Sequence, residues 1–352
     1  MGPKQHVRLQ KGNITTRMGK IRAGAHKTDG NMIAYFTTYL VVNLDLADIF
    51  SGASSSKEAI MRILALHGLG ASGAMLKAQL RPFIKSFGKE HQFVFFEGAV
   101  PCGRGPAVPA WESGPFQSYA TGFTPQEMRE ALHRIDKFIR QTGPFDGVLG
   151  FSLGSAMAVS YILDQQRRNP DSRPPFDFAL FFSPIFVASP DDACYERLVD
   201  RILDDDHAEF RAEFPDGDSA SLLGSEEERV FTEYLKVVLS MHSSVGTSLP
   251  NTRLDFLSFE AQASNVPRLL HPDIYKERVR IPTVHVSGLN DVPAMEKQSQ
   301  VAEGLYTPSL TQLYRHDGGH EIPFKKAEVM TIISMVNDTA EKGKQLQALY
   351  DF

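Results

Sequence analysis

The sequence predicts an α/β fold in which a mostly parallel six-stranded sheet is flanked by helices and carries a cap-like insertion. Six apolar runs of strand length recur after residue 60, and helix-like segments lie between them. The hydrophobicity of these runs is nearly continuous, which is typical of strands buried on both faces of a parallel sheet. Strands that alternate with helices indicate right-handed β-α-β units. About 95 residues separate the fourth run from the fifth, more than a crossover needs, and this interval predicts the insertion.

The six predicted strands follow one another along the chain and define its order of elements. They are MRILALH (61–67), QFVFFEG (92–98), FDGVLGF (145–151), DFALFFS (177–183), PTVHVSG (282–288) and TQLYRHD (311–317).

The clearest predicted helix covers residues 125–141. Thr124 suits the N-cap, Pro125 suits the first helical position, and Glu127 completes a Thr-x-x-Glu capping box. The apolar positions that follow recur at helical spacing, so one face of this helix is expected to pack against the sheet.

The pattern divides the chain into parts. We expect an N-terminal extension over 1–60, a folded domain over 61–342 with an insertion at about 185–280, and a C-terminal tail over 343–352. The first 28 residues hold seven lysines and arginines and no acidic residue. This composition fits either a transit peptide or a disordered extension, and a gene-model artefact is a third reading. The acid-rich stretch 200–218 is interpreted as a solvated helix face, and the insertion as a cap over one edge of the sheet.

The bulk composition excludes several classes of partner. The 352 residues carry a formal net charge of −5, so there is no electrostatic reason to expect nucleic acid or an anionic membrane. Two cysteines cannot form a disulfide framework and favour a reducing compartment. No apolar run approaches the roughly 18 residues of a membrane span. We therefore expect a cytoplasmic protein.

A glycine-rich stretch after the third predicted strand suggests a nucleophile. Residues 150–154 read Gly-Phe-Ser-Leu-Gly, which matches G-x-S-x-G. A serine on a tight strand-to-helix turn needs neighbours with almost no side chain two residues away on either side. The strand before the motif and the small residues after it favour Ser152 as the nucleophile over an ordinary turn.

A nucleophilic serine needs a histidine base that is oriented by a carboxylate. In α/β-hydrolases these residues follow in the order Ser, Asp or Glu, His, each after a strand. Asp291 lies in the turn after the fifth predicted strand, and His320 follows a double glycine after the sixth. The rivals are His316, which is interpreted as a packed or edge histidine, and Asp317, which is too close in sequence to serve His320.

Acyl chemistry also needs donors for the developing oxyanion. The backbone N–H of Leu153, directly after the nucleophile, is the first candidate. The second is expected from LHGLGASG (66–73), where we assign Leu69 and keep Gly70 as the near alternative. His67 in the same stretch is interpreted as a support of this loop.

Four stretches together resemble the fungal serine hydrolase (FSH) family of α/β-hydrolases. They are LALHGLGASG, FDGVLGFSLGSAMA, HVSGLNDVPAMEKQSQVAEGL and HDGGHEIP, and they cover residues 61 to 338 in the family's order. The resemblance implies a compact serine esterase or thioesterase with Ser152, Asp291 and His320 as its triad. Family members similar to the lovastatin-pathway thioesterase release polyketide chains from carrier domains. The apolar Leu153, the long 184–280 interval and the first 60 residues depart from the family's pattern.

The expected activity is hydrolysis of an ester or thioester, with release or trimming of an acyl or polyketide chain in fungal secondary metabolism. No metal or organic cofactor is called for. The expected partners are a small acyl ester or thioester and a carrier domain of a polyketide synthase. An acyltransferase, a general carboxylesterase and a non-catalytic binding protein remain as alternatives. The acyl pocket is expected between the sheet edge and the insertion, with four aromatic residues as candidates for its lining: Trp111, Phe186, Phe256 and Phe259.

Overall fold

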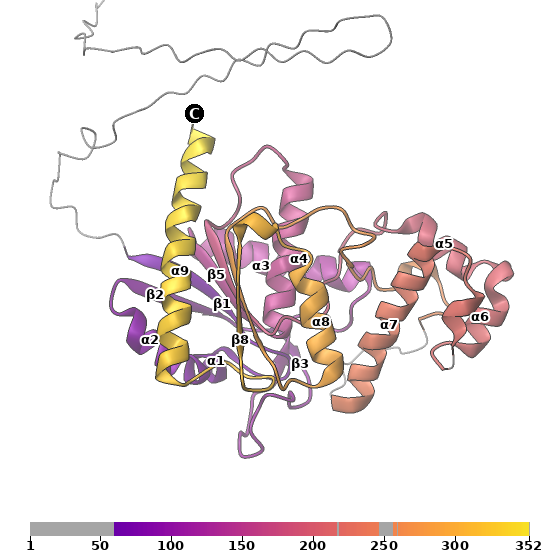
Figure 1. Cartoon of the computed structure of the whole chain (residues 1–352), viewed down its shortest axis with the longest axis horizontal. Coiled ribbons are helices and arrows are strands. Elements are labelled where there is room, and N and C mark those ends of the chain that lie inside the picture. The colour runs from indigo at the N-terminus through magenta and orange to yellow at the C-terminus, as the bar shows by residue number, and fades with distance from the viewer. Residues whose placement is uncertain (1–59, 217, 246–255, 259, 352) are drawn as a thin grey trace, which may run out of the picture. The chain divides into compact units, whose positions relative to one another are not determined.

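The computed structural model describes residues 60–216, 218–245, 256–258 and 260–351. The predictions for the N-terminal extension concern residues outside this part. One six-stranded sheet forms the centre of the described domain, its strands are all parallel, and their order is β2-β1-β5-β6-β7-β8 (Figure 1). The strands are β1 (Met61–Leu66), β2 (His91–Phe96), β5 (Gly147–Phe151), β6 (Phe178–Phe182), β7 (Thr283–Gly288) and β8 (Thr311–His316). The predicted α/β-hydrolase fold with its six-stranded sheet is confirmed.

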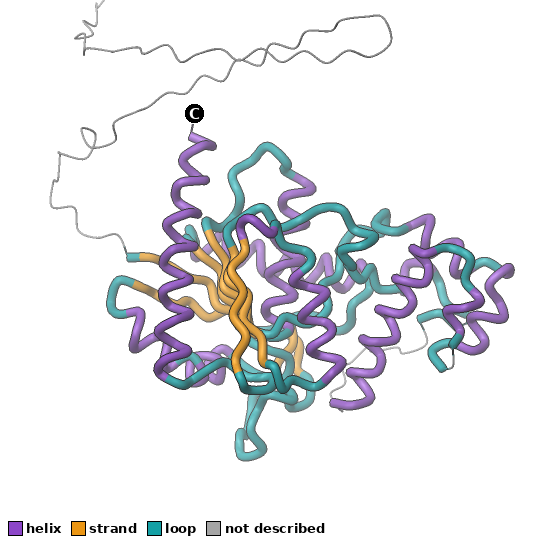
Figure 2. Tube along the Cα trace, in the orientation of Figure 1, coloured by secondary structure: helices purple, strands orange, loops and turns teal. Residues whose placement is uncertain are grey.

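Helices cover both faces of this sheet (Figure 2). Those before the insertion are α1 (Gly73–Gln79), α2 (Arg81–Phe87), α3 (Pro125–Thr142) and α4 (Leu153–Arg168). The later ones are α5 (Glu196–Leu203), α6 (Ala208–Glu213), α7 (Glu226–Val245), α8 (Pro293–Glu303) and α9 (Lys326–Gln347). Two short strands, β3 (Val100–Pro101) and β4 (Gln117–Ser118), pair antiparallel outside the sheet.

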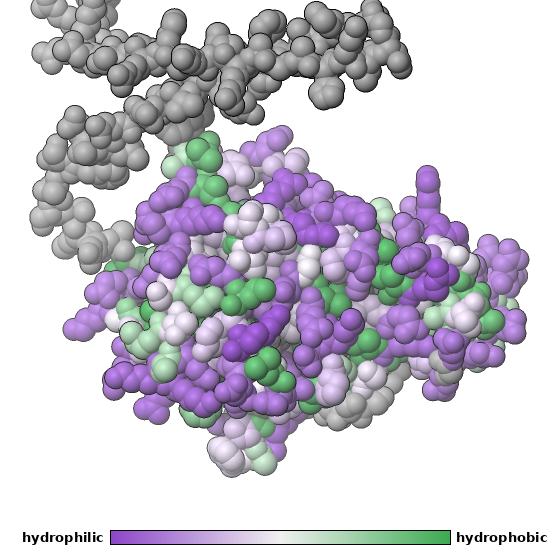
Figure 3. Space-filling view, in the orientation of Figure 1, coloured by the Kyte–Doolittle hydropathy of each residue, from purple (hydrophilic) through white to green (hydrophobic). Residues whose placement is uncertain are grey.

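The two faces of the sheet bury two separate clusters. Leu64 and Val148 point to the cluster that contains α3, α4 and α8, whereas Ile63 and Leu149 point to the one that contains α1, α2 and α9. Neighbouring residues of a strand point to opposite faces, so a strand covered on both sides buries every position. This explains the continuous apolar runs of β5 and β6, which are buried throughout. Outside, hydrophilic residues dominate the face shown in Figure 3 and apolar ones form small groups.

Helix α3 begins as its sequence predicts. The Thr124 hydroxyl accepts from the Glu127 N–H (3.3 Å), and the Glu127 carboxylate accepts from the Thr124 N–H (3.0 Å). The capping box is therefore complete, and the helix ends at Thr142, one residue beyond the prediction.

None of the helices in the described part of the chain combines the length and the apolar character that a membrane crossing requires.

The insertion between β6 and β7 carries α5, α6 and α7, and α7 packs against α8. Its two ends meet in a short stem. The Ser189 N–H donates to the Arg268 carbonyl (2.9 Å) and the Leu270 N–H donates to the Val187 carbonyl (2.8 Å). Residues 246–255 lie outside the described part, so the covering of the sheet edge stays a prediction.

Helix α9 crosses residue 343, where the C-terminal tail was predicted to begin. Helix α9 continues through residue 343 to Gln347 without a break. A Cβ at Gly343 would lie 2.2 Å from the Asp177 carbonyl oxygen, so the helix passes directly against the chain before β6. Glycine there permits close packing of α9 against that segment.

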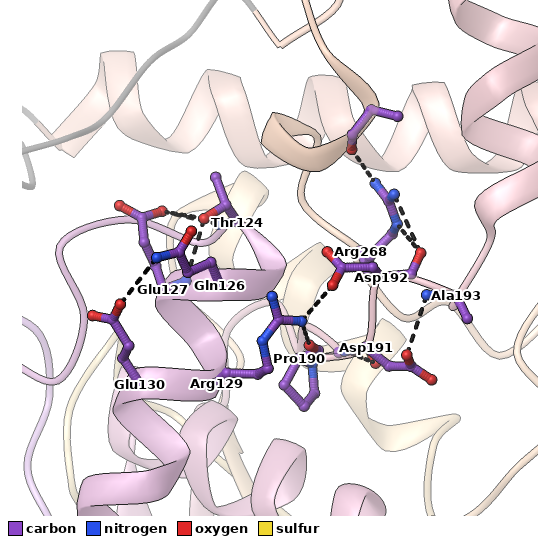
Figure 4. A network of polar contacts seen from close by, with 12 residues as sticks. Thr124, Gln126, Glu127, Arg129, Glu130, Pro190, Asp191, Asp192, Ala193 and Arg268 are labelled. Carbon is purple, nitrogen blue, oxygen red and sulfur yellow. Dashed lines mark hydrogen bonds and ion pairs between the residues drawn. The ribbon is translucent and has the colours of Figure 1, made fainter.

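A polar network joins the stem to α3 (Figure 4). Arg129 of α3 donates to Asp192 (2.6 Å) and to the Pro190 carbonyl (2.8 Å). Arg268, which is 2% exposed, donates to the carbonyls of Val266 (2.7 Å) and Ala263 (2.9 Å) and approaches that of Asp192 at 3.4 Å. One buried guanidinium therefore holds both ends of the insertion.

We expect Arg268→Met to lower the free energy of unfolding by about 2–4 kcal/mol, because it removes the donor from several buried carbonyls while keeping a side chain of similar length. Urea unfolding of the full chain measures it. Arg129→Met is the matched control: its side chain is 45% exposed, and loss of an exposed pair costs about 1 kcal/mol or less. Equal losses in the two variants would contradict the central place given to Arg268.

The buried His285 of β7 is expected to make the free energy of unfolding depend on pH. The side chain is fully buried, and burial with the nearby Arg315 charge lowers the pKa of His285 to about 3. In the unfolded chain the same ring titrates near pH 6.5. The unfolded state therefore binds the extra proton, so this stabilisation is complete above about pH 6.5 and falls by about 1.4 kcal/mol per pH unit between about 6.5 and 3.

The unfolding free energy of the wild type falls as the pH is lowered from about 6 to 4. We expect His285→Gln to reduce this slope by up to about 1.4 kcal/mol per pH unit, which corresponds to one proton fewer taken up on unfolding. Urea unfolding at a series of pH values measures the slope. His133→Gln, at an exposed position of α3, should keep the wild-type slope. A slope for His285→Gln that equals wild type would rule out this histidine as the source.

Candidate active site

Three predicted site residues meet at the carboxyl edge of the sheet. Ser152 directly follows β5, Asp291 lies three residues beyond β7, and His320 lies four residues beyond β8. The carboxyl ends of parallel strands meet at one edge, which is why loops distant in sequence converge there.

The turn at Ser152 has an unusual backbone. Its φ is 52° and its ψ −117°, in the region that favours glycine, while its N–H donates to the Phe182 carbonyl of β6 (2.9 Å). A Cβ at Gly150 would lie 2.4 Å from the Ser155 backbone, and one at Gly154 would lie 2.2 Å from the Leu66 carbonyl oxygen. The steric reason predicted for both motif glycines therefore holds. A strained non-glycine residue at such a turn costs about 1–3 kcal/mol, which points to a function at this serine.

A continuous hydrogen-bonded chain links the three side chains. His320 Nε2 lies 2.9 Å from Ser152 Oγ, and His320 Nδ1 lies 2.7 Å from Asp291 Oδ2. The other Asp291 oxygen accepts from the Val292 N–H at 2.7 Å. With Nδ1–H donating to the carboxylate, Nε2 is left as an acceptor for the serine hydroxyl. The side chains of Asp291 and His320 are 1% and 9% exposed, so the pair is shielded from bulk water.

The loop that carries His320 packs closely on the end of β7. A Cβ at Gly288 would lie 2.2 Å from the Gly319 carbonyl oxygen and 2.4 Å from that of Gly318. The Asn290 N–H donates to the Gly318 carbonyl (3.0 Å), which ties the loop of Asp291 to that of His320. Gly288 was not singled out from the sequence. The signal available there was a glycine at the end of a predicted strand.

The two rivals lie outside this chain of hydrogen bonds. His316 is buried, its Nδ1 accepts from the Gly318 N–H at 3.1 Å, and burial lowers its pKa, which favours the neutral ring. Its interpretation as a packed histidine is confirmed. Asp317 is exposed, and its backbone carbonyl accepts from the Asn290 side chain.

The loop after β1 borders Ser152 on its other side. A Cβ at Gly68 would lie 3.5 Å from Ser152 Cβ, so this loop is in direct contact with the serine. The Gly70 N–H is engaged by the Gln117 carbonyl (3.0 Å), whereas the Leu69 N–H has no hydrogen-bond partner among the described residues. Leu153 opens α4, so its N–H has no carbonyl of its own helix to bond. The structure thus favours Leu69 over Gly70 as the second donor.

His67 supports this loop from within. Its Nδ1 lies 2.8 Å from the Gly68 carbonyl and its Nε2 accepts from the Gly98 N–H at 3.0 Å. Burial lowers the pKa of His67, so the ring is neutral and each nitrogen has its partner. The Tyr119 hydroxyl donates to the His67 carbonyl (3.0 Å). The predicted supporting role agrees with these contacts.

The four aromatic residues predicted to line the acyl pocket lie in different places. Trp111 is 83% exposed and lines a groove formed by α1, α2 and residues 321–324, so its predicted place beneath the insertion is wrong. It lies in the long β3–β4 loop, whose course the sequence pattern did not reveal. Phe186 is buried in the larger core cluster, edge to face with Phe123, and Phe256 packs against the same cluster. Phe259 lies outside the described residues.

Comparisons with known proteins find similarity to esterases and hydrolases of fungi. A family model described as "Serine hydrolase (FSH1)" matches residues 56–332. The chain is 32% identical to "Esterase alnB" of Emericella nidulans, over 82% of this chain and 99% of the relative. It is 27% identical to "Serine hydrolase cnsH" of Penicillium expansum, over 62% and 88%, and 27% identical to "Hydrolase FUB4" of Fusarium oxysporum, over 79% and 98%.

Proposed function

The chain belongs to the serine hydrolase (FSH1) family and hydrolyses esters, and we propose that it does so through a triad of Ser152, His320 and Asp291. The observation that carries the proposal is the unbroken chain of hydrogen bonds from Ser152 Oγ through both ring nitrogens of His320 to Asp291. Its 2.9 and 2.7 Å distances are those that proton transfer by a positioned base requires.

The reaction proceeds by two acyl transfers. His320 Nε2 takes the hydroxyl proton as Ser152 Oγ attacks the carbonyl carbon, and Asp291 stabilises the imidazolium that forms. The N–H groups of Leu153 and Leu69 stabilise the tetrahedral oxyanion. His320 returns the proton to the leaving alcohol or thiol, which departs and leaves an acyl-enzyme. Water then repeats the cycle: it gives a proton to His320, the acid is released, and Ser152 regains its proton.

The substrate that we propose is an acyl or polyketide chain held as an ester or thioester on a carrier domain. The support is the resemblance to the fungal family and the long insertion between β6 and β7. This insertion contributes Leu257 and Leu235 to the apolar cluster that lies on the α4 side of the sheet.

A set of substrates with one acyl group tests both parts of the proposal. Octanoyl p-nitrophenyl ester, octanoyl-N-acetylcysteamine and an octanoyl-loaded carrier domain differ only in the leaving group. We expect Ser152 to be labelled by a fluorophosphonate and the thioesters to be hydrolysed. Hydrolysis of the ester alone would indicate a general carboxylesterase. Transfer to an added alcohol or amine in preference to water would indicate an acyltransferase, and absence of labelling would indicate a non-catalytic protein.

A further inference from the structure

A groove of about 960 Å³ lies beside the candidate site and has no role in the mechanism above. It is bounded by α1 and α2, by the loop between β3 and β4, and by the segment that follows His320. Two large aromatic side chains in it are open to solvent, Trp111 at 83% and Phe324 at 63% exposure. Its lining is largely apolar and includes Met75, Ile84, Val108, Trp111, Ile322 and Phe324. Exposed aromatic residues gathered around a groove mark an interaction surface.

One wall of this groove carries a row of cations. Lys77, Arg81 and Lys85 lie four residues apart on α1 and α2, all three are exposed, and none has an acidic partner among the described residues. Arg81 and Lys85 lie four residues apart on α2 and therefore share one face of that helix, while Lys77 lies in the last turn of α1. The groove also contains Glu112 and Glu321, so the cations are concentrated on the α1–α2 wall. This wall is positive although the whole chain carries a net charge of −5.

The groove adjoins both sides of the candidate site. Glu321 and Ile322, which line it, directly follow His320. On the other side the Gly105 N–H donates to the Gly70 carbonyl (3.0 Å), which joins the β3–β4 loop to the loop of Leu69. A molecule held in the groove would therefore lie next to the loops that surround Ser152.

We propose that this groove docks an acidic amphipathic helix of the protein that delivers the acyl chain. The inference rests on the proposed function, since it names the partner of the same site. An amphipathic helix places apolar side chains in a groove and presents a charged flank. Acidic residues on the charged flank of that helix would pair with the three cations of the α1–α2 wall.

Other occupants fit the groove less well. A bilayer is flat, and a concave floor with aromatic residues inside it suits a protein helix better than a lipid surface. The first 28 residues of this chain carry seven cations and no acid, so charge disfavours their binding beside the three cations. A second copy of the chain could offer the acidic stretch 200–218, and the experiment below separates this case.

The test compares two thioesters of octanoic acid, one on the phosphopantetheine arm of a polyketide synthase carrier domain and one on N-acetylcysteamine. In Lys77→Glu/Arg81→Glu/Lys85→Glu we expect kcat/KM to fall at least tenfold for the carrier-bound substrate and to stay within twofold for the small one. Added salt should lower the wild-type rate on the carrier and leave the variant's rate nearly unchanged. Trp111→Ala should act in the same direction.

The matched control is Lys137→Glu/Lys276→Glu/Lys344→Glu, which reverses three exposed cations away from the groove. It changes the net charge by the same amount as the groove variant, and it should hydrolyse both thioesters at the wild-type rates. Equal losses in the two triple variants, or equal effects on both thioesters, would overturn the docking proposal. So would binding of the wild type, lost in the groove variant, to phosphatidylserine vesicles and not to the carrier. Groove-dependent self-association in sedimentation would likewise replace the carrier with a second copy.

A binding measurement without turnover tests the docking proposal independently of the proposed hydrolase function. Fluorescence anisotropy with a labelled carrier domain measures affinity without turnover, in the Ser152→Ala background. If neither thioester is hydrolysed but the carrier binds wild type and not the groove variant, the substrate assignment fails and the docking stands. If both thioesters are hydrolysed equally well and the carrier does not bind, the docking fails and the hydrolase function stands.

Discussion

Replacement of Ser152 by alanine is expected to lower kcat for p-nitrophenyl acetate by about 10⁴-fold or more, because it removes the atom that forms the acyl-enzyme. Residual turnover would come from the oxyanion donors and from binding alone. Steady-state hydrolysis measures the loss, and fluorophosphonate labelling should vanish with it. Thermal unfolding of this variant should remain close to wild type.

Two further variants test whether the loss of activity is due to the Ser152 hydroxyl alone. Ser155→Ala removes a hydroxyl three residues away, whose donation to the Phe182 carbonyl (3.1 Å) supports the turn without facing His320. It should keep activity within several-fold. Ser152→Gly should be inactive yet more stable by about 1 kcal/mol, because glycine adopts the positive φ without strain. Near wild-type activity in either Ser152 variant would disprove the nucleophile assignment.

Asp291→Asn is expected to lower kcat by about 10³- to 10⁴-fold. An amide that donates to Nδ1 holds the wrong tautomer, which leaves Nε2 protonated and unable to accept the Ser152 proton. It also removes the negative charge that stabilises the imidazolium. The same p-nitrophenyl ester assay, carried out across a range of pH, measures the change.

Asp317→Asn is the matched control for this loss. Asp317 lies three residues before His320, and its side chain is exposed. Its substitution keeps the backbone carbonyl that Asn290 binds. We expect activity within about twofold of wild type. A large loss for Asp317→Asn together with a small one for Asp291→Asn would exchange the two assignments.

The sheet could be predicted from the sequence because its physical cause is local. Strands buried on both faces, such as β5 and β6, are continuous apolar runs. All six runs coincide with strands to within two residues at either end. The capping box of α3 is local in the same way. The sequence did not show that α9 continues past residue 343, where Gly343 lets the helix pass against the distant Asp177.

The site was predictable only as far as residue type and order along the chain determine it. Ser152, Asp291 and His320 follow three separate strands in the expected order, and the structure brings them together. The sequence left Leu69 and Gly70 open as the second oxyanion donor. They differ only in the structure, where the Gly70 N–H donates to the Gln117 carbonyl. Trp111 was misplaced for a similar reason, since nothing local to the β3–β4 loop shows which helices it lies against.

The stem at Val187–Ser189 and Arg268–Leu270 has a consequence for the evolution of substrate range. Its two sides are joined by their own backbone hydrogen bonds and held by Arg268, so the segment between them begins and ends at neighbouring points. Lengthening a loop whose ends already meet costs little, about 0.6 kcal/mol for each doubling of its length. Selection can therefore enlarge, shorten or exchange residues 190–267 as a unit while the reacting groups on β5, β7 and β8 stay in register. A scaffold built in this way can acquire new acyl specificities without having to reassemble its chemistry.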